Sequence, residues 1–128
     1  MKRRIIKKPK KPSIAQMDKL WAEIIKIKAG YKCEYCGRKD TLNSHHLFSR
    51  SSMGMRWNIQ NGCCLCAGHH VFGNFSAHKA PFEFVDWIKN RRGEEWYKQL
   101  RFQAGQVYKP NYYAIKTGLD EIKKSLTS

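Results

Sequence analysis

Acidic residues are scarce in this chain. Its 128 residues include 10 Asp and Glu against 25 Lys and Arg, which gives a formal net charge of +15 at pH 7. Residues 2–12 hold seven basic residues and no acidic one, and the rest of the chain, with 18 basic and 10 acidic residues, still carries +8. The shortage of acidic residues therefore extends over the whole chain. It indicates a protein that binds polyanions, with nucleic acid as the first candidate, whereas a merely well-solvated surface is the plainer alternative.

Long apolar stretches are missing as well. No apolar run approaches the roughly 18 residues of a membrane-spanning helix, and the charged N-terminus lacks the apolar stretch of a secretory signal. We therefore expect a cytoplasmic protein with no membrane partner. In a reducing compartment, five clustered cysteines indicate a metal site rather than disulfides.

The length of the chain predicts one domain with extended ends. We expect a basic disordered arm over residues 1–12, a domain over 13–105 and a C-terminal extension over 106–128. Apolar residues at helical spacing after Ser13 predict a first helix that ends near Gly30. Two strands are predicted, at residues 42–48 and 59–62. Four further helices are predicted: a short one just after Cys66, and others at 81–90, 94–104 and 119–126.

Metal-binding residue types are concentrated in one part of the sequence. A stretch of 38 residues contains all five cysteines and four of the five histidines. Two pairs with two-residue spacers, Cys33-x2-Cys36 and Cys66-x2-His69, are separated by 29 residues, and together they can supply the four soft ligands of a tetrahedral zinc ion. Cys63-x2-Cys66 has the same spacing, so an all-cysteine set with Cys63 in place of His69 stays open.

A second group of polar residues accompanies the zinc pairs. His45 and His46 are neighbours on a predicted strand, so their side chains point to opposite faces and cannot easily bind one ion. That geometry suits one histidine as a metal ligand and the other as a base. Asn61 and His70 follow 15 and 24 residues after His46, and this combination favours a functional interpretation over an incidental histidine pair.

These motifs resemble the HNH endonucleases, and in particular small phage-type members of that family. The resemblance covers residues 31–90 and implies a small zinc-stabilised α+β domain of the ββα-metal (His-Me finger) class with flanking helices. The nine-residue gap from Asn61 to His70 agrees with the family pattern, in which the residue after the last zinc ligand binds the catalytic ion. The motifs that carry the resemblance are Ser44-His45-His46-Leu47, Arg50, Arg56-Trp57, Asn61, Leu65-Cys66-Ala-Gly-His69-His70 and Ala77-His78-Lys79-Ala80-Pro81.

The resemblance implies a role for each matching position. His45 and His70 take the places of the ligands of a catalytic divalent ion. His46 takes the place of the general base, and Asn61 that of the asparagine that constrains the loop and orients the base. The same alignment favours His69 over Cys63, so the implied ligands of the structural Zn²⁺ are Cys33, Cys36, Cys66 and His69.

Two positions depart from the family pattern. His69 stands where the family more often has Cys, which is a conservative change for zinc. Asn74 stands one helical turn beyond His70, where the nuclease colicins have a further His. We interpret Asn74 as a polar helix residue rather than a ligand.

The implied activity is the hydrolysis of DNA phosphodiester bonds, by nicking or by double-strand cleavage, with 5′-phosphate and 3′-hydroxyl ends. Two imidazole ligands are softer than the oxygen shell that Mg²⁺ prefers, so we expect Mn²⁺, Ni²⁺ or Co²⁺ to support activity at least as well as Mg²⁺. The candidate nucleic-acid contacts near the motifs are Arg50, Arg56, His78 and Lys79.

The alternative is a non-catalytic zinc-ribbon module that binds nucleic acid. It accounts for the charge and the cysteines but gives no task to His45, His46, Asn61 and His70. The phage-type resemblance also implies the cytoplasm of a bacterial host, where proteins of a phage or mobile-element system would be the partners.

Overall fold

The computed structural model of this chain describes residues 10–128, so most of the predicted arm over residues 1–12 lies outside the described residues. The helices are α1 (Ile14–Lys28), α2 (Met53–Arg56), α3 (Pro81–Arg92), α4 (Glu94–Ala104) and α5 (Tyr112–Thr127), and the strands are β1 (Leu42–His46) and β2 (Gly62–Cys66). Two single turns complete this part of the chain: a 3₁₀ turn at Ile59–Asn61 and a π turn at Gly68–Phe72.

Helix α1 begins and ends where the sequence predicts. The Ser13 hydroxyl accepts a hydrogen bond from the Gln16 backbone N–H, and the Gln16 side chain accepts one from the Ser13 N–H, so both orphan donors are satisfied. Gly30, in the left-handed region at φ 67°, follows the last turn. One face of α1 is buried and carries Trp21, which later contributes to the candidate site.

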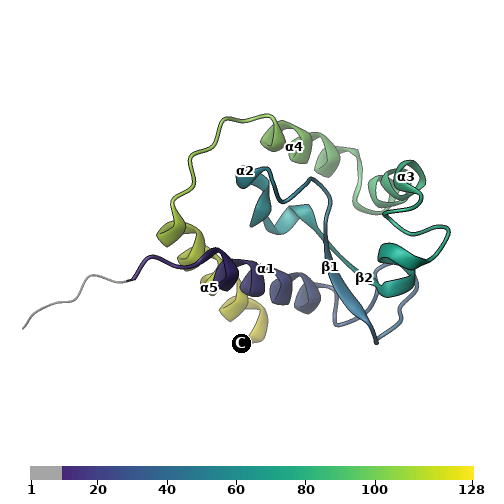
Figure 1. The fold of residues 1–128 in the computed structure, drawn as a ribbon, viewed down its shortest axis with the longest axis horizontal. Coiled ribbons are helices and arrows are strands. Elements are labelled where there is room, and N and C mark those ends of the chain that lie inside the picture. The colour runs from purple at the N-terminus through teal and green to yellow at the C-terminus, as the bar shows by residue number, and fades with distance from the viewer. Residues whose placement is uncertain (1–9) are drawn as a thin grey trace, which may run out of the picture.

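The two strands form an antiparallel sheet in the middle of the molecule (Figure 1). His45 pairs with Cys63 and His46 with Gly62, and because side chains alternate along a strand, these two pairs face opposite sides. Ser44 and His46 face α1: the Ser44 hydroxyl donates to the Ala22 carbonyl of that helix at 2.6 Å. His45 faces α3, where its ring meets Phe84 edge-on at 5.5 Å.

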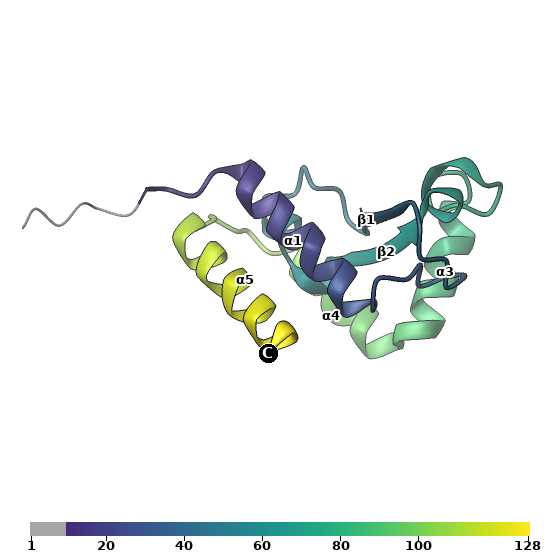
Figure 2. The same cartoon turned by 90° about the horizontal axis from the view of Figure 1, so that it is seen from below.

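Two apolar clusters lie on the two sides of the sheet. The first joins α1 to α5 and to Cys64, and α5 runs beside α1 (Figure 2) with Leu119 buried between them. The second joins β2 to α3 through Leu65, Phe84 and Ile88. The protein is therefore a small α+β domain whose two-stranded sheet separates an α1/α5 side from an α3/α4 side.

The structure departs from the predicted elements in three places. The strand predicted over 59–62 is wrong: that stretch is mostly a 3₁₀ turn, and the strand runs over Gly62–Cys66, where small cysteines hide the alternation that marks a strand. The turn after Cys66 ends at Phe72, since the Gly73 N–H closes it onto the Gly68 carbonyl at 2.7 Å. The last helix is longer than predicted and begins at Tyr112, capped by the Asn111 side chain.

In the described part of the chain, no helix has both the length and the apolar character needed to cross a membrane.

Candidate metal centres

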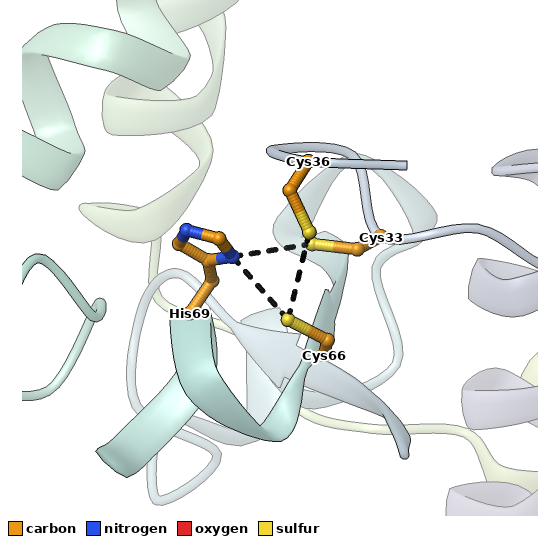
Figure 3. Close-up of side chains that lie close together, drawn as sticks. All are labelled: Cys33, Cys36, Cys66 and His69. Atoms are coloured by element: carbon orange, nitrogen blue, oxygen red, sulfur yellow. Dashed lines mark hydrogen bonds between the residues drawn. The ribbon is translucent and has the colours of Figure 1, made fainter. Parts of the chain in front are cut away.

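The first centre joins two segments that are 30 residues apart. Cys33 and Cys36 lie in the loop after α1, folded back by two backbone bonds, Gly37 N–H to Cys33 O and Cys33 N–H to Arg38 O, both 2.8 Å. Gly37 has φ 80°, which glycine adopts without a steric penalty. Cys66 ends β2, and His69 lies in the π turn that follows (Figure 3).

The donor atoms of this centre fit a tetrahedral ion. All four lie within 4.8 Å of one another. The Sγ atoms of Cys36 and Cys66 are 3.8 Å apart, and His69 Nδ1 lies 3.3 Å from Cys66 Sγ and 3.9 Å from Cys33 Sγ. A tetrahedron with metal–sulfur bonds of about 2.3 Å has sulfur–sulfur edges of about 3.8 Å. The Cys33, Cys36, Cys66 and His69 group can therefore hold a metal such as zinc.

The alternative ligand Cys63 is left out of this centre. Its side chain is fully buried on the α3 side of β2, beneath His45 in the pairing register. Burial raises the pKa of the Cys63 thiol, so it stays a neutral, buried side chain. For Cys33, burial also opposes ionisation, but hydrogen bonds with the backbone of Cys66, Cys36 and Tyr35 outweigh it and lower the pKa of that thiol.

Glu34 and Arg92, which the sequence did not mark as functional, connect the first centre to β2 and α3. Glu34 accepts the Cys64 N–H at 2.7 Å and donates its own N–H to the Cys64 carbonyl at 2.8 Å. Arg92 of α3 bonds Glu34 at 3.0 Å and the Gly62 carbonyl at 2.8 Å. Their side chains are largely buried, so this ion pair ties the Cys33 loop, β2 and α3 into one unit.

The second centre consists of three histidines from three different segments. His45 comes from β1, His70 from the π turn and His78 from the loop before α3, and their ring nitrogens lie within 4.8 Å of one another. The Nε2 atoms of His70 and His78 are 3.1 Å apart. Metal–nitrogen bonds of about 2.1 Å at 90° to 109° place two nitrogens about 3.0 to 3.4 Å apart, so the spacing fits a shared ion.

The electrostatics of this second group suit a cation. Burial, and then the neighbouring imidazoles, lower the pKa of His45 to about 3. Burial also lowers the pKa of His70. The His45 and His70 rings are thus neutral near pH 7, and their lone pairs are free to bind metal without first releasing a proton. We refer to His45, His70 and His78 as the histidine trio.

His78 reaches the trio because the chain doubles back after the π turn. Its backbone N–H donates to the His70 carbonyl at 3.2 Å, and the Ala77 N–H donates to the His69 carbonyl at 2.8 Å. Asn74 lies beyond the end of the turn and is exposed, so the prediction that it is a helix residue is wrong. The family pattern has a further His at the position of Asn74, which we did not expect to be a ligand here, and the structure instead brings His78 to the other two histidines.

His46 lies on the opposite face of β1, as the strand geometry predicts. Its ring stacks on Trp21 with the centroids 3.9 Å apart and the planes at 7°. Its Nε2 lies 2.9 Å from the Arg56 carbonyl, so Nε2 carries the proton and Nδ1 is the nitrogen with the free lone pair. Gly62 pairs with His46, and the absence of a side chain there lets Trp21 approach the sheet.

The Arg56 carbonyl is held in place from two directions. On one side, Asp18 of α1 accepts Nε and Nη2 of Arg56 at 2.8 and 2.6 Å, and also the Trp57 indole N–H at 2.9 Å. The Arg56 hydrogen bond is the largest of the effects that lower the pKa of Asp18. Asp18 thus reaches His46 through Arg56, whose side chain binds Asp18 and whose carbonyl binds His46, a connection with no signal in the linear sequence.

On the other side, the fully buried Asn61 holds the loop between the strands. Its Oδ1 accepts the Phe48 N–H at 2.7 Å, and its Nδ2 donates to the carbonyls of Phe48 and Met55 at 3.1 and 3.0 Å. Met55 directly precedes Arg56. Asn61 therefore restrains both ends of the loop whose carbonyl binds His46.

The predicted nucleic-acid contacts fall into different surroundings. Arg50 is exposed; burial lowers the pKa of His46, and the charge of Arg50 acts in the same direction. Lys79 is exposed and donates to the Phe72 carbonyl at 2.9 Å. The Arg56 guanidinium is already engaged by Asp18 and is 17% exposed, whereas Arg50 and Lys79 are open to solvent.

Comparisons with protein-family models, curated proteins and solved structures found no match to this chain.

Proposed function

We propose that this protein is a metal-dependent DNA endonuclease of the HNH type, with the ββα-metal arrangement built from β1, β2 and the π turn. The observation that carries the proposal is the presence of two separate ligand sets that meet at adjacent residues. His69 belongs to the cysteine-rich set and His70 to the histidine trio. A domain that needed only a structural metal would have no use for the second set.

The three imidazoles of the trio would hold the catalytic ion, and His78 joins the two ligands that the resemblance implies. A bound divalent ion supplies charge neutralisation at a scissile phosphate and its leaving oxygen. Three nitrogen ligands favour Mn²⁺, Co²⁺ or Ni²⁺ over Mg²⁺, because Mg²⁺ prefers oxygen ligands. The cysteine-rich set would hold structural Zn²⁺.

His46 would act as the general base. With Nε2 engaged by the Arg56 carbonyl, Nδ1 is the atom that accepts a proton from water. Burial lowers the pKa of His46, so the neutral, proton-accepting form predominates near pH 7. Asp18 and Asn61 would keep the ring in one orientation through the carbonyl that it binds.

The net charge of +15 supports DNA as the substrate, with Arg50, close to His46, and Lys79, next to His78 in the chain, as phosphate contacts. The lysine-rich N-terminal residues would add affinity that depends on salt and not on sequence. The cytoplasm of a bacterial host, which the phage-type resemblance implies, is part of the same proposal.

One observation favours the alternative, a zinc-stabilised module that binds nucleic acid without cutting it. The His46 ring faces α1 rather than the trio, and one of its two nitrogens is already bonded. A nuclease requires that His46 can take a proton from a water molecule to form hydroxide next to the trio, whereas a binding module does not. A cleavage assay distinguishes the two functions.

The test is incubation of zinc-loaded protein with supercoiled plasmid and added Mn²⁺, Mg²⁺ or no ion. We expect nicking that is fastest with Mn²⁺ and absent without an added ion, and we expect His46→Ala to lower the rate at least about 100-fold. No nicking with any divalent ion would favour the binding module. Equal nicking by His46→Ala would show that His46 is not the base.

A further inference from the structure

An apolar cavity opens beside the histidine trio and is not needed for holding either metal. Its volume is about 380 Å³, within the range of small-molecule sites. His45 lines it as well as belonging to the trio, so the cavity and the candidate catalytic centre share a wall. The other walls come from the chain after β1, from α3 and from α4.

Aromatic side chains supply much of the lining. Phe48, Phe84 and Tyr97 come from three different segments and contribute ring surfaces to one cavity. Phe48 is held in place on both sides of its peptide by Asn61. A preformed cavity with aromatic walls suits a flat, apolar-faced ligand, because stacking needs little rearrangement.

The charge around the cavity is positive. Among the residues that line it, Arg101 is the one with a full charge, and no acidic side chain is present. The Tyr97 ring has Lys89 Nζ 4.8 Å and Arg101 Cζ 5.8 Å from its centroid, although Lys89 also pairs with Glu94. Sites that bind single-stranded nucleic acid typically combine aromatic rings, on which bases stack, with Lys and Arg side chains, which bind the phosphates.

We propose that this cavity binds an unstacked nucleobase of a nucleic acid whose phosphate lies at the histidine trio. The inference rests on the proposed function in taking nucleic acid as the ligand and in placing its phosphate at the histidine trio. A base next to the reacting phosphate would leave the duplex stack, so the protein would favour single-stranded, flapped or mismatched DNA, where a base is released at the lowest cost.

The test uses the zinc-loaded full chain with no catalytic ion, so that nothing is cleaved. The probes are the single-stranded oligomer dT12 and 2-deoxyribose 5-phosphate, which has the sugar and phosphate but no base. We expect dT12 to shift the methyl NMR signals of Val85, Ile88 and Leu100, which line the cavity. The sugar phosphate is expected to leave those three residues unshifted.

The matched variants are Val85→Trp and Ile122→Trp. Val85 lines the proposed cavity and is 40% exposed, whereas Ile122 lines a cavity of about 350 Å³ beside α5 and is 38% exposed. Val85→Trp fills the proposed site and is expected to raise the Kd for dT12 about tenfold, while Ile122→Trp stays within about twofold of the unmodified protein. Tyr97→Leu removes one aromatic face but keeps apolar bulk, and is expected to raise the Kd about fivefold.

Three results would overturn the inference: unshifted cavity methyls with dT12, equal shifts with the sugar phosphate, or an unchanged Kd in Tyr97→Leu. Unshifted methyls with dT12 would mean that the cavity either binds an apolar side chain of a partner protein or is only a packing defect. Failure of the proposed nuclease function is seen separately, as loss of plasmid nicking while dT12 still shifts the methyls. Nicking that survives with unshifted methyls would reject the cavity site alone.

Discussion

The two metal centres differ in how the fold surrounds them. In the cysteine-rich centre, Cys33 and Cys66 are buried, and the ion pair between Glu34 and Arg92 ties the cysteine loop to β2 and α3. The histidine trio is half-exposed, draws on three separate segments and borders an open cavity. Under the proposed function, the adjacent residues His69 and His70 serve opposite needs, because a structural metal is enclosed by its ligands, whereas a reactive one must leave room for a substrate.

The largest expected effect comes from the enclosed centre. Cys36→Ser should release zinc and abolish the cooperative unfolding transition, because a structural zinc ion contributes about 10 kcal/mol or more to folding. Cys63→Ala is the matched control, since Cys63 is buried outside the centre, and it should keep one equivalent of zinc. Zinc content and thermal unfolding measure both. Because Cys36 belongs to both ligand sets, zinc loss in Cys63→Ala as well as in Cys36→Ser would reinstate the all-cysteine set.

The second prediction compares the two neighbours at the junction. His70→Ala should keep zinc and the melting temperature but lower Mn²⁺ affinity and plasmid nicking at least about 100-fold. His69→Ala should lose zinc and unfold. Zinc analysis, calorimetry of Mn²⁺ binding and the nicking assay separate the two outcomes. If both variants lost zinc and both kept their Mn²⁺ affinity, the assignment of His69 and His70 to two different centres would be wrong.

A smaller effect distinguishes His78 from Asn74. His78→Ala removes one of three nitrogens and should weaken Mn²⁺ binding by about 10- to 100-fold without changing zinc content. Asn74→Ala, at the exposed position where the nuclease colicins have a further His, should change neither. A reversed order, with Asn74→Ala weakening Mn²⁺ binding and His78→Ala silent, would mean that the loop moves when metal binds.

The smallest effect concerns the support of His46 from α1. Asp18→Asn removes the charged partner of Arg56 and should cost about 1 to 3 kcal/mol in the free energy of unfolding. We expect the maximal nicking rate to fall several-fold, with the Kd for DNA unchanged, because Asp18 acts on the ring orientation and touches no substrate.

The pH dependence of the Asp18 effect has a defined sign. Its pKa is lowered from 3.8 in the folded protein, so the stabilisation is complete above that value and is lost as the pH falls through the folded pKa. The difference in stability between the variant and the unmodified protein should therefore be constant from about pH 5 to pH 9. If the difference in stability grew between pH 6 and pH 8, the pH dependence would come from another titratable group and not from Asp18.

The parts of the site that the sequence predicted are those set by short spacings. A two-residue spacer between Cys33 and Cys36 brings both thiols to one point in any tight turn, and strand alternation places His45 and His46 on opposite faces. Helix α1 was predictable because its cap and its apolar spacing lie in neighbouring residues.

The parts that the sequence did not predict depend on contacts between distant segments. His78 joins the trio only because the loop after the π turn pairs with the His70 backbone. Asp18 lies 38 residues from Arg56, and on a helix with an apolar face it gave no sign of its partner. The start of β2 was misplaced because its residues are small and buried on both sides, so they show no alternation of apolar and polar residues.

The junction of His69 and His70 also imposes an order of assembly. One peptide group joins a ligand of the enclosed centre to a ligand of the open one. Under the proposed function, zinc bound at His69 would also fix the turn that presents His70 to His45 and His78. Zinc would therefore be loaded first, and protein purified without zinc is expected to bind its second ion more weakly.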